Sequence, residues 1–285
     1  MNVQFDCYPC IFAMLVKLTN ALKQDDETRR ELMNVFLGYL KDNGKNITPP
    51  ELASFFYTEY NRLAGCDDHY ADEKIHSTNF ALQLYDNLAR HVSNAGDPFT
   101  SAVKFAIAGN IIDYGATPDF NLAKAEKEIM DIAHLPLDTA AANELKQRVG
   151  AAGKILYILD NCGEAVLDRL LLEQFAEKVT LAVRGKAIFN DITRQELSIS
   201  KLDKFRCIDT GDNTPGVSLS GSTENFVREM READLIIAKG QGNFESLEGC
   251  WREKPIFFLF RVKCPVISKY INAPAGSLQL IGRNL

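Results

Sequence analysis

The feature that most constrains the fold is a series of five short, apolar, β-rich runs in the second half of the chain. The runs occupy residues 155–160, 179–184, 206–210, 235–239 and 256–260. Helix-like stretches separate most of them, at residues 164–177, 224–231 and 244–251. Nearly continuous apolar strands that alternate with helices are typical of a mostly parallel sheet covered on both faces. We therefore predict a three-layer α/β domain over residues 151–285.

The first 150 residues carry the spacing of helices instead. Apolar residues recur three and four positions apart over residues 10–22, 28–40, 50–63, 79–92 and 100–114. Local signals agree, because Thr48 precedes two prolines with Glu51 three positions on, and Gly115 follows the last run. We predict an N-terminal all-helical domain over residues 1–150, with the boundary near Gly150 and Gly153.

The composition restricts the partners of the protein. With 32 Lys and Arg against 38 Asp and Glu, the net charge is −6, so the surface repels nucleic acid and anionic membranes. A local basic pocket for a small anion is compatible with this charge. No apolar run approaches the roughly 18 residues of a membrane span, and the N-terminus lacks the features of a signal peptide. The seven cysteines are an odd number and a poor disulfide framework, so we expect a reduced, cytoplasmic protein.

Polar residues and glycines follow each predicted strand. The segments are DNCGE (160–164), RGK (184–186) leading to Asn190 and Asp191, DTGDN (209–213), KGQGN (239–243) and RVK (261–263). Any one of them can be explained as turn chemistry. In open parallel sheets, however, ligands bind outside the carboxyl ends of the strands. Five such segments in succession, with both acidic and basic members, favour a functional site at this edge.

The acidic members of this group suit a hard metal ion. Asp160, Asn161 and Asp191 offer carboxylate and carboxamide oxygens, which Mg²⁺ and Mn²⁺ prefer, with room for water and a substrate phosphate. Such a metal polarises phosphorus and activates water. The donor set therefore favours metal-assisted phosphoryl hydrolysis, although a ligand-binding module would look similar.

The basic and glycine members suit a phosphate group. Candidate phosphate contacts are Arg184, Lys239 and Lys263, and Asn190 is a further candidate substrate contact beside the metal ligands. Gly240 and Gly242 allow backbone N–H groups to approach an anion at a helix N-terminus. Cations of this kind absorb the charge that develops during phosphoryl transfer.

Several segments resemble one family. The family is the domain-of-unknown-function 89 proteins, also called damage-control phosphatases, and the segments are LDNCGEAVLD (159–168), VRGKAIFNDIT (183–193), ADLIIAKGQGNFE (233–245) and VKCPVI (262–267). AGNIIDYG (108–115) and CYPC (7–10) resemble the helical region of its prokaryotic branch. The combination of DN-x-GE, R-x6-ND and KGQGN is specific, whereas none of the three is specific alone.

The resemblance implies a helical domain packed on a Rossmann-like domain, with a divalent metal (Mn²⁺, Mg²⁺, Co²⁺ or Ni²⁺) in the cleft. It also implies hydrolysis of small phosphate monoesters, such as sugar phosphates or damaged phosphometabolites. The family's metal ligands correspond to Asp160, Asn161 and Asp191. Its substrate-phosphate contacts correspond to Lys239, Gly240, Gly242, Asn243 and Lys263. Cys162 and Ala187 stand at variable points of the motifs, and neither removes a ligand.

Two polar residues of the helical half also match the family. Asn110 and Asp113 lie three positions apart, so they share one face of a helix. They either reach into the cleft and contact substrate or form a polar patch at the helix end before Gly115.

A second metal site is a further hypothesis. Cys7 and Cys10 have chelate spacing, and Cys66 with His69 would complete a four-ligand set for structural Zn²⁺ or Fe. Cysteines are also small apolar groups that pack in cores, and plain packing is the more common reason for such a motif.

Other functions fit the motifs less well. An S-adenosylmethionine-dependent carboxyl methyltransferase should have a multi-glycine loop after the first strand, and DNCGEA contains a single glycine. GQGNFE lacks the third glycine of a dinucleotide-binding loop, and no G-x4-GK[ST] motif occurs. A non-catalytic sugar-phosphate-binding protein is the strongest rival, although it has little use for two aspartates and an asparagine facing a phosphate. The sequence leaves open the substrate, the metal, the oligomeric state, and whether water or an aspartate attacks phosphorus.

Overall fold

The computed structural model describes residues 1–22, 24–110 and 122–285. Its first half is helical and contains α1 (Tyr8–Ala21), α2 (Asp26–Asn43), α3 (Pro49–Ala64), α4 (Ala71–Asn94), α5 (Pro98–Ala108), α6 (Leu122–Ala133) and α7 (Thr139–Ala151). Its second half contains β1 (Ile155–Ile158), α8 (Cys162–Leu172), β2 (Val179–Val183), β3 (Arg206–Asp209), α9 (Glu224–Glu232), β4 (Leu235–Lys239), α10 (Gly240–Leu247), β5 (Ile256–Arg261), α11 (Pro265–Ile271) and β6 (Leu278–Arg283).

The described residues form a six-stranded sheet with the order β3-β2-β1-β4-β5-β6. β1 to β5 are parallel, whereas β6 runs antiparallel to β5. All five predicted strands are confirmed, and β6 at the edge is an addition that the sequence analysis missed. The chain reverses its direction of travel across the sheet between β1 and β4, and this switch point is where open α/β sheets bind ligands.

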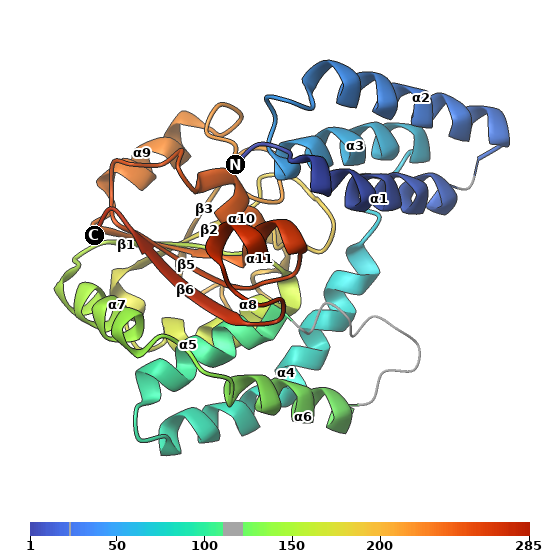
Figure 1. The fold of residues 1–285 in the computed structure, drawn as a ribbon. Helices are drawn as coiled ribbons and strands as arrows, with labels where there is room; N and C mark the ends of the chain where they lie inside the picture. The colour runs from blue at the N-terminus through green and yellow to red at the C-terminus, as the bar shows by residue number, and fades with distance from the viewer. Residues whose placement is uncertain (23, 111–121) are drawn as a thin grey trace.

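Each face of the sheet has its own hydrophobic layer, which confirms the predicted α/β class with three layers. Along β1, Ile155 and Tyr157 pack into one layer, and Leu156 and Ile158 pack into the other. This alternation follows from the two-residue period of a strand. The first layer is covered by α4, α5, α7 and α8, and the second by α9, α10 and α11 (Figure 1).

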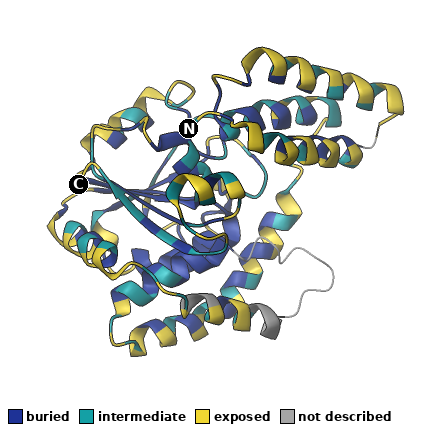
Figure 2. Ribbon diagram, in the orientation of Figure 1, coloured by how far each residue is buried: buried dark blue, intermediate teal, exposed yellow. Residues whose placement is uncertain are grey.

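The helices of the first half belong to two groups. α1, α2 and α3 pack around a separate hydrophobic cluster that includes Leu15, Phe36 and Phe56. α4, α5 and α7 instead contribute to the first hydrophobic layer on the sheet. Figure 2 shows that buried residues are concentrated in this layer and along α8. The predicted domain boundary near residue 150 stays a prediction, and the hydrophobic packing places a division earlier in the chain, between α3 and α4.

Local chemistry explains several helix ends. The predicted capping box at α3 is present, since the Thr48 N–H donates to Glu51 Oε2 and the Glu51 N–H donates to Thr48 Oγ1 at 3.1 and 3.3 Å. The helix predicted to start at residue 244 starts earlier, directly after β4, so the KGQGN segment forms the first turn of α10. No helix within the described ranges is long and apolar enough to cross a membrane.

Candidate active site at the carboxyl ends of the strands

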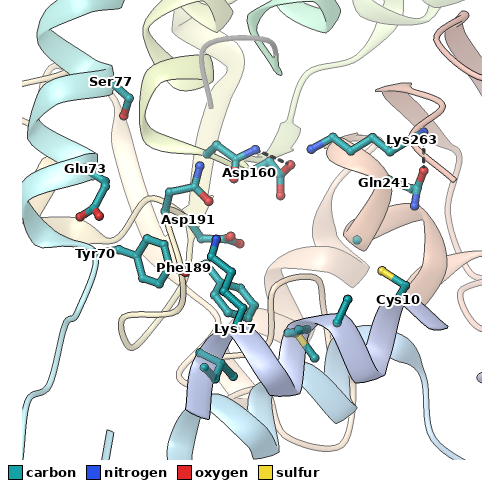
Figure 3. Close-up of a pocket in the computed structure, with 16 residues that line it drawn as sticks. Cys10, Lys17, Tyr70, Glu73, Ser77, Asp160, Phe189, Asp191, Gln241 and Lys263 are labelled. Carbon is teal, nitrogen blue, oxygen red and sulfur yellow. Dashed lines mark hydrogen bonds between the residues drawn. The ribbon is translucent and has the colours of Figure 1, made fainter. Parts of the chain in front are cut away.

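A cavity of about 830 Å³ lies at the carboxyl ends of the strands, between the sheet and the N-terminal helices (Figure 3). On the α/β side it is lined by Asp160, Asn161, Asn190, Asp191, Gly242 and Lys263. These six were all candidate site residues, and the four segments that follow β1, β2, β4 and β5 bring them together as the strand-end rule predicts. On the helical side the wall includes Lys17 from α1 and Glu73 and Ser77 from α4.

Backbone hydrogen bonds hold the predicted metal ligands next to one another. Asp160 and Asn161 follow β1, and Asn161 is the residue before the first turn of α8. The Ile192 N–H donates to the Asp160 carbonyl at 2.9 Å, and the Cys162 N–H donates to the Asn190 carbonyl at 3.0 Å. Asn161 and Asp191 are therefore paired in an antiparallel bridge, which puts their side chains at the same end of the cavity.

Arg184 lies beneath these ligands and does not line the cavity. Its side chain is buried, with Nε 2.7 Å from Asp191 Oδ2 and Nη2 3.6 Å from Asp160 Oδ1. Its Nη1 donates to the Gly216 carbonyl at 2.6 Å. The prediction that Arg184 clamps the substrate phosphate does not fit this placement, because its guanidinium is buried and directed at the two carboxylates and at a backbone carbonyl.

The electrostatics of the two carboxylates favour an additional cation. Burial, followed by the charges of Asp191 and Glu164, raises the pKa of Asp160 well above its usual value. Burial also raises the pKa of Asp191, although Arg184 opposes the shift. Two desolvated carboxylates beside one arginine thus retain an unfavourable negative charge, which a divalent cation in the cavity would neutralise.

The donor chemistry fits a hard divalent metal. No cluster of three or more His, Cys, Asp or Glu side chains within the described ranges is arranged to hold a metal ion, so the candidate set consists of two carboxylates and one carboxamide. Oxygen ligands of this kind suit Mg²⁺ and Mn²⁺, which keep several waters. Asp160, Asn161 and Asp191 therefore fit the group that the sequence analysis expects.

Gly240 allows the close approach on which this arrangement depends. Its φ is +78°, and a Cβ built on it would lie 1.9 Å from Asp160 Oδ2. Neither condition is compatible with a side chain. Gly240 therefore supports the Asp160 carboxylate from behind, whereas Gly242 itself lines the cavity.

The prediction that Lys239 contacts the substrate phosphate is wrong in this structure. Its Nζ is fully buried and donates to Glu164 Oε1 at 2.6 Å, to Asp168 Oδ1 at 2.7 Å and to the Ala106 carbonyl at 2.8 Å. The two carboxylates raise its pKa against the opposing effect of burial. All three ammonium protons are used inside the protein, so Lys239 does not contact a phosphate in this structure.

Two other predicted substrate contacts are buried as well. Asn243 Nδ2 donates to the Lys239 carbonyl at 2.6 Å, and its Oδ1 accepts from Arg184. Asn110 Nδ2 donates to Glu164 Oε2 at 2.9 Å, so Asn110 supports Glu164 and does not line the cavity. Asp113, its predicted companion, lies outside the described residues.

The hypothesis of a second metal site is wrong as stated. Cys7, Cys10, Cys66 and His69 do not form a metal-binding group within the described ranges. The His69 ring instead packs edge-on against Tyr60, with its Nδ1 3.3 Å from the Tyr60 hydroxyl. Cys10 lines the main cavity at its helical side. Spacing alone could not show that the two half-sites point to different neighbours.

The helical wall of the cavity contains residues that the sequence analysis missed. They are Lys17, Tyr70, Glu73 and Ser77, and on the α/β side Phe189 and Gln241 were missed as well. Phe189 has a φ of +41°, in the left-handed region, and its ring lies 5.1 Å from Tyr57 and 5.9 Å from Tyr70. Non-glycine residues with such a strained backbone conformation cluster at functional sites. This sign can be recognised in a structure but not in a sequence.

Glu245, on α10, gives a pH-dependent stability prediction. Burial raises the pKa of this carboxyl from its usual 4.5 to about 6. The folded protein therefore binds a proton more tightly than the unfolded chain, and the free energy of unfolding falls as pH rises from 4.5 through 6. Glu245→Gln removes this loss and keeps the bond from Gln241, so the variant should be more stable above that window by up to about 2 kcal/mol.

Denaturant titrations across the window check this expectation. Below the usual pKa of glutamate both proteins carry a neutral group and should be about equally stable. Glu31→Gln, at an exposed position on α2, is the matched control and should leave the pH profile unchanged. Parallel profiles for Glu245→Gln and the parent protein would contradict the prediction.

Comparisons with known proteins agree with this geometry. A sequence profile of the damage-control phosphatase ARMT1-like domain matches residues 3–278. A damage-control phosphatase from Pyrococcus horikoshii is 33% identical over 286 residues, covering 98% of this chain and 97% of the relative. One from Archaeoglobus fulgidus is 26% identical and covers 98% of each chain.

A solved structure shows the same fold. The crystal structure of a domain-of-unknown-function 89 family protein from Pyrococcus horikoshii superimposes with a TM-score of 0.86, at 33% identity, over 98% of each chain. The names of the relatives support a phosphatase that acts on a small phosphorylated substrate. With a family profile and relatives that extend over nearly its whole length, the chain belongs to the damage-control phosphatase ARMT1-like family.

Proposed function

We propose that this protein hydrolyses small phosphate monoesters, such as sugar phosphates or damaged phosphometabolites, with the help of a divalent metal held by Asp160, Asn161 and Asp191. One observation carries the proposal. These three hard oxygen donors meet at the base of a cavity of about 830 Å³ that Lys263 also lines. A purely binding site for a phosphate would gain little from two buried carboxylates, because they repel the ligand.

The residues of the chain divide the work of the reaction. When bound, a divalent metal polarises the phosphoryl group and makes water a better nucleophile. Lys263 extends into the cavity toward Asp160, where its ammonium can hold a phosphate oxygen (Figure 3). Arg184 fixes Asp191 from behind at 2.7 Å, so the ligand does not have to reorganise during the reaction. Water attacks phosphorus, the bond from phosphorus to the alcohol oxygen breaks, and the proton that the water loses is balanced by the one that the leaving alcohol takes up.

The experiment that tests the proposal is phosphate release from p-nitrophenyl phosphate and a panel of sugar phosphates. Protein stripped with a chelator should release none, and addition of Mn²⁺, Mg²⁺, Co²⁺ or Ni²⁺ should restore release. Equal phosphate release by the stripped and the metal-loaded protein would contradict the proposed dependence on a metal. Folded protein that binds sugar phosphates but releases no phosphate with any of these metals would support the sugar-phosphate-binding alternative.

Lys17 should contribute to substrate binding from the helical wall. It lies on α1, is exposed to solvent and lines the cavity. Because its charge attracts an anionic substrate in the ground state and in the transition state alike, Lys17→Ala should raise KM about tenfold with kcat little changed. Steady-state kinetics at two salt concentrations check this, since the effect should shrink at high salt. Lys41→Ala, on an exposed position of α2, is the control, and an equal rise in KM there would refute the specific role.

A further inference from the structure

The side-chain amide of Asn161 lies between two carboxylates. Its Nδ2 donates to Asp160 Oδ2 at 3.1 Å and to Glu164 Oε2 at 3.2 Å. Carboxylate oxygens accept hydrogen bonds and cannot donate, so only the NH₂ end of the amide can occupy this side. Both amide N–H groups are therefore used, and the Asn161 Oδ1 is left for the cavity that the residue lines.

Glu164 is itself held in one position. It is fully buried on α8, where its Oε1 accepts from Lys239 at 2.6 Å and its Oε2 accepts from Asn110 at 2.9 Å. The neighbouring helix α5 approaches closely at Gly109, where a Cβ would lie 3.2 Å from Glu164 Cα and Cγ. Asn110, which follows α5, and Lys239, at the end of β4, thus fix this carboxylate, although Glu164 does not line the cavity.

We infer that Glu164 is a positioning residue, which orients the Asn161 amide so that its oxygen faces the metal. The inference rests on the metal-dependent function proposed above. In this arrangement Lys239 acts through Glu164 and holds the acceptor in place, instead of contacting substrate. Carboxylates that orient a metal ligand through a hydrogen bond contribute substantially to metal affinity.

A simpler role for Glu164 would be that of an acidic residue in the first turn of α8, where its negative charge interacts favourably with the helix dipole. Its contacts argue against this as the main role. Both carboxylate oxygens point to side chains of other elements or to Asn161, and the start of α8 has no side-chain cap hydrogen bond. The carboxylate is thus directed at the amide of a metal ligand.

The first test is calorimetric titration of Mn²⁺ into metal-free full-length protein. Glu164→Gln retains the shape of the side chain but must direct its NH₂ group either at the donor Lys239 or at the two donors Asn110 and Asn161. We expect the Kd for Mn²⁺ to rise about 10- to 100-fold. An unchanged Kd in a variant that melts cooperatively would overturn the inference and leave the phosphatase proposal standing.

The second test exchanges the two partners. Asn161→Asp adds a carboxylate, which would ordinarily strengthen cation binding, but here it faces Asp160 and Glu164 without a proton to donate. Mn²⁺ affinity should fall about tenfold or more. Combining it with Glu164→Gln supplies an amide donor to the new carboxylate and should restore most of the affinity. Tighter binding by Asn161→Asp, or no recovery in the double variant, would contradict the orientation of the amide.

Tyr157→Phe is the matched control. The Tyr157 hydroxyl donates to Asp168 Oδ1 at 2.9 Å in the same buried cluster, so its hydrogen bond goes to a carboxylate other than Glu164. Its removal should lower stability without changing the Kd for Mn²⁺. An equal loss of Mn²⁺ affinity in Tyr157→Phe would mean that the buried cluster affects metal binding only by stabilising the fold, and would contradict the positioning role of Glu164. Absence of Mn²⁺ binding by the unsubstituted protein would overturn both this inference and the proposed function.

Discussion

Asp191→Asn is expected to lower kcat/KM for phosphate release by about 10³-fold or more. The substitution removes one of the two anionic groups among the proposed metal ligands and takes away the negative charge that faces the buried guanidinium of Arg184 at 2.7 Å. Loss of roughly 4 kcal/mol of charge stabilisation at the phosphoryl group corresponds to this factor. The measurement is steady-state release from p-nitrophenyl phosphate at saturating Mn²⁺, with the melting temperature recorded in parallel.

Asp209→Asn provides the matched control for this experiment. Asp209 also ends a parallel strand, β3, and pairs with Arg194 at 2.6 Å, but it does not line the cavity. Its replacement should leave phosphate release within about twofold of the parent, because surface ion pairs contribute little. Comparable losses in the two variants would mean that activity follows fold stability and does not depend on Asp191 as a ligand.

Gly240→Ala is expected to abolish metal binding and to lower activity at least about 10²-fold. The added methyl group would lie 1.9 Å from Asp160 Oδ2, so either the carboxylate or the start of α10 has to move. A displacement of about 1 Å in a catalytic group is sufficient for a loss of this size. The variant also places a non-glycine residue at a φ of +78°, which costs about 1 kcal/mol or more.

Gly249→Ala separates the two causes. Gly249 has nearly the same φ, +76°, and no atom lies within 4 Å of the position of its Cβ. This variant should carry the backbone cost of about 1 kcal/mol alone, with Mn²⁺ binding and phosphate release unchanged. If both alanine variants lose activity equally, the contact between Gly240 and Asp160 is not the reason.

The sequence was sufficient to predict which residues could form the metal site. β-rich runs that alternate with helices predict a mostly parallel sheet. The residues that follow parallel strands meet at one edge of such a sheet. Asp160 and Asp191 were predicted together for this reason, although β1 and the segment after β2 are separated by α8. Edge strand β6 was missed because it runs antiparallel and its burial alternates, so it lacks the continuous apolar run of the other strands.

The direction of each side chain could not be predicted in the same way. Lys239 is the last residue of β4 and Lys263 lies two residues after β5, yet one ammonium is fully buried and the other residue lines the cavity. The partners that bury Lys239, namely Glu164, Asp168 and the Ala106 carbonyl, come from α8 and α5. A lysine at a strand end has the same appearance in a sequence whether it binds a phosphate or neutralises two buried carboxylates.

The residues of the cavity wall opposite the candidate metal site could be identified only from the tertiary structure. Lys17, Glu73 and Ser77 occupy ordinary polar positions on α1 and α4, and a polar residue on a helix is usually only solvated. They become part of the site because α1 to α3 pack as a separate cluster beside the sheet.

The sequence by itself thus determined the α/β class, the edge of the sheet at which the candidate site lies and the choice of three oxygen donors as its proposed metal ligands. These follow from periodicity and strand direction, which are local properties of the chain. The tertiary structure alone decided that Arg184 and Lys239 support ligands from within and that the N-terminal helices close the cavity. Those outcomes depend on contacts between residues far apart in the chain, and no local pattern encodes such contacts.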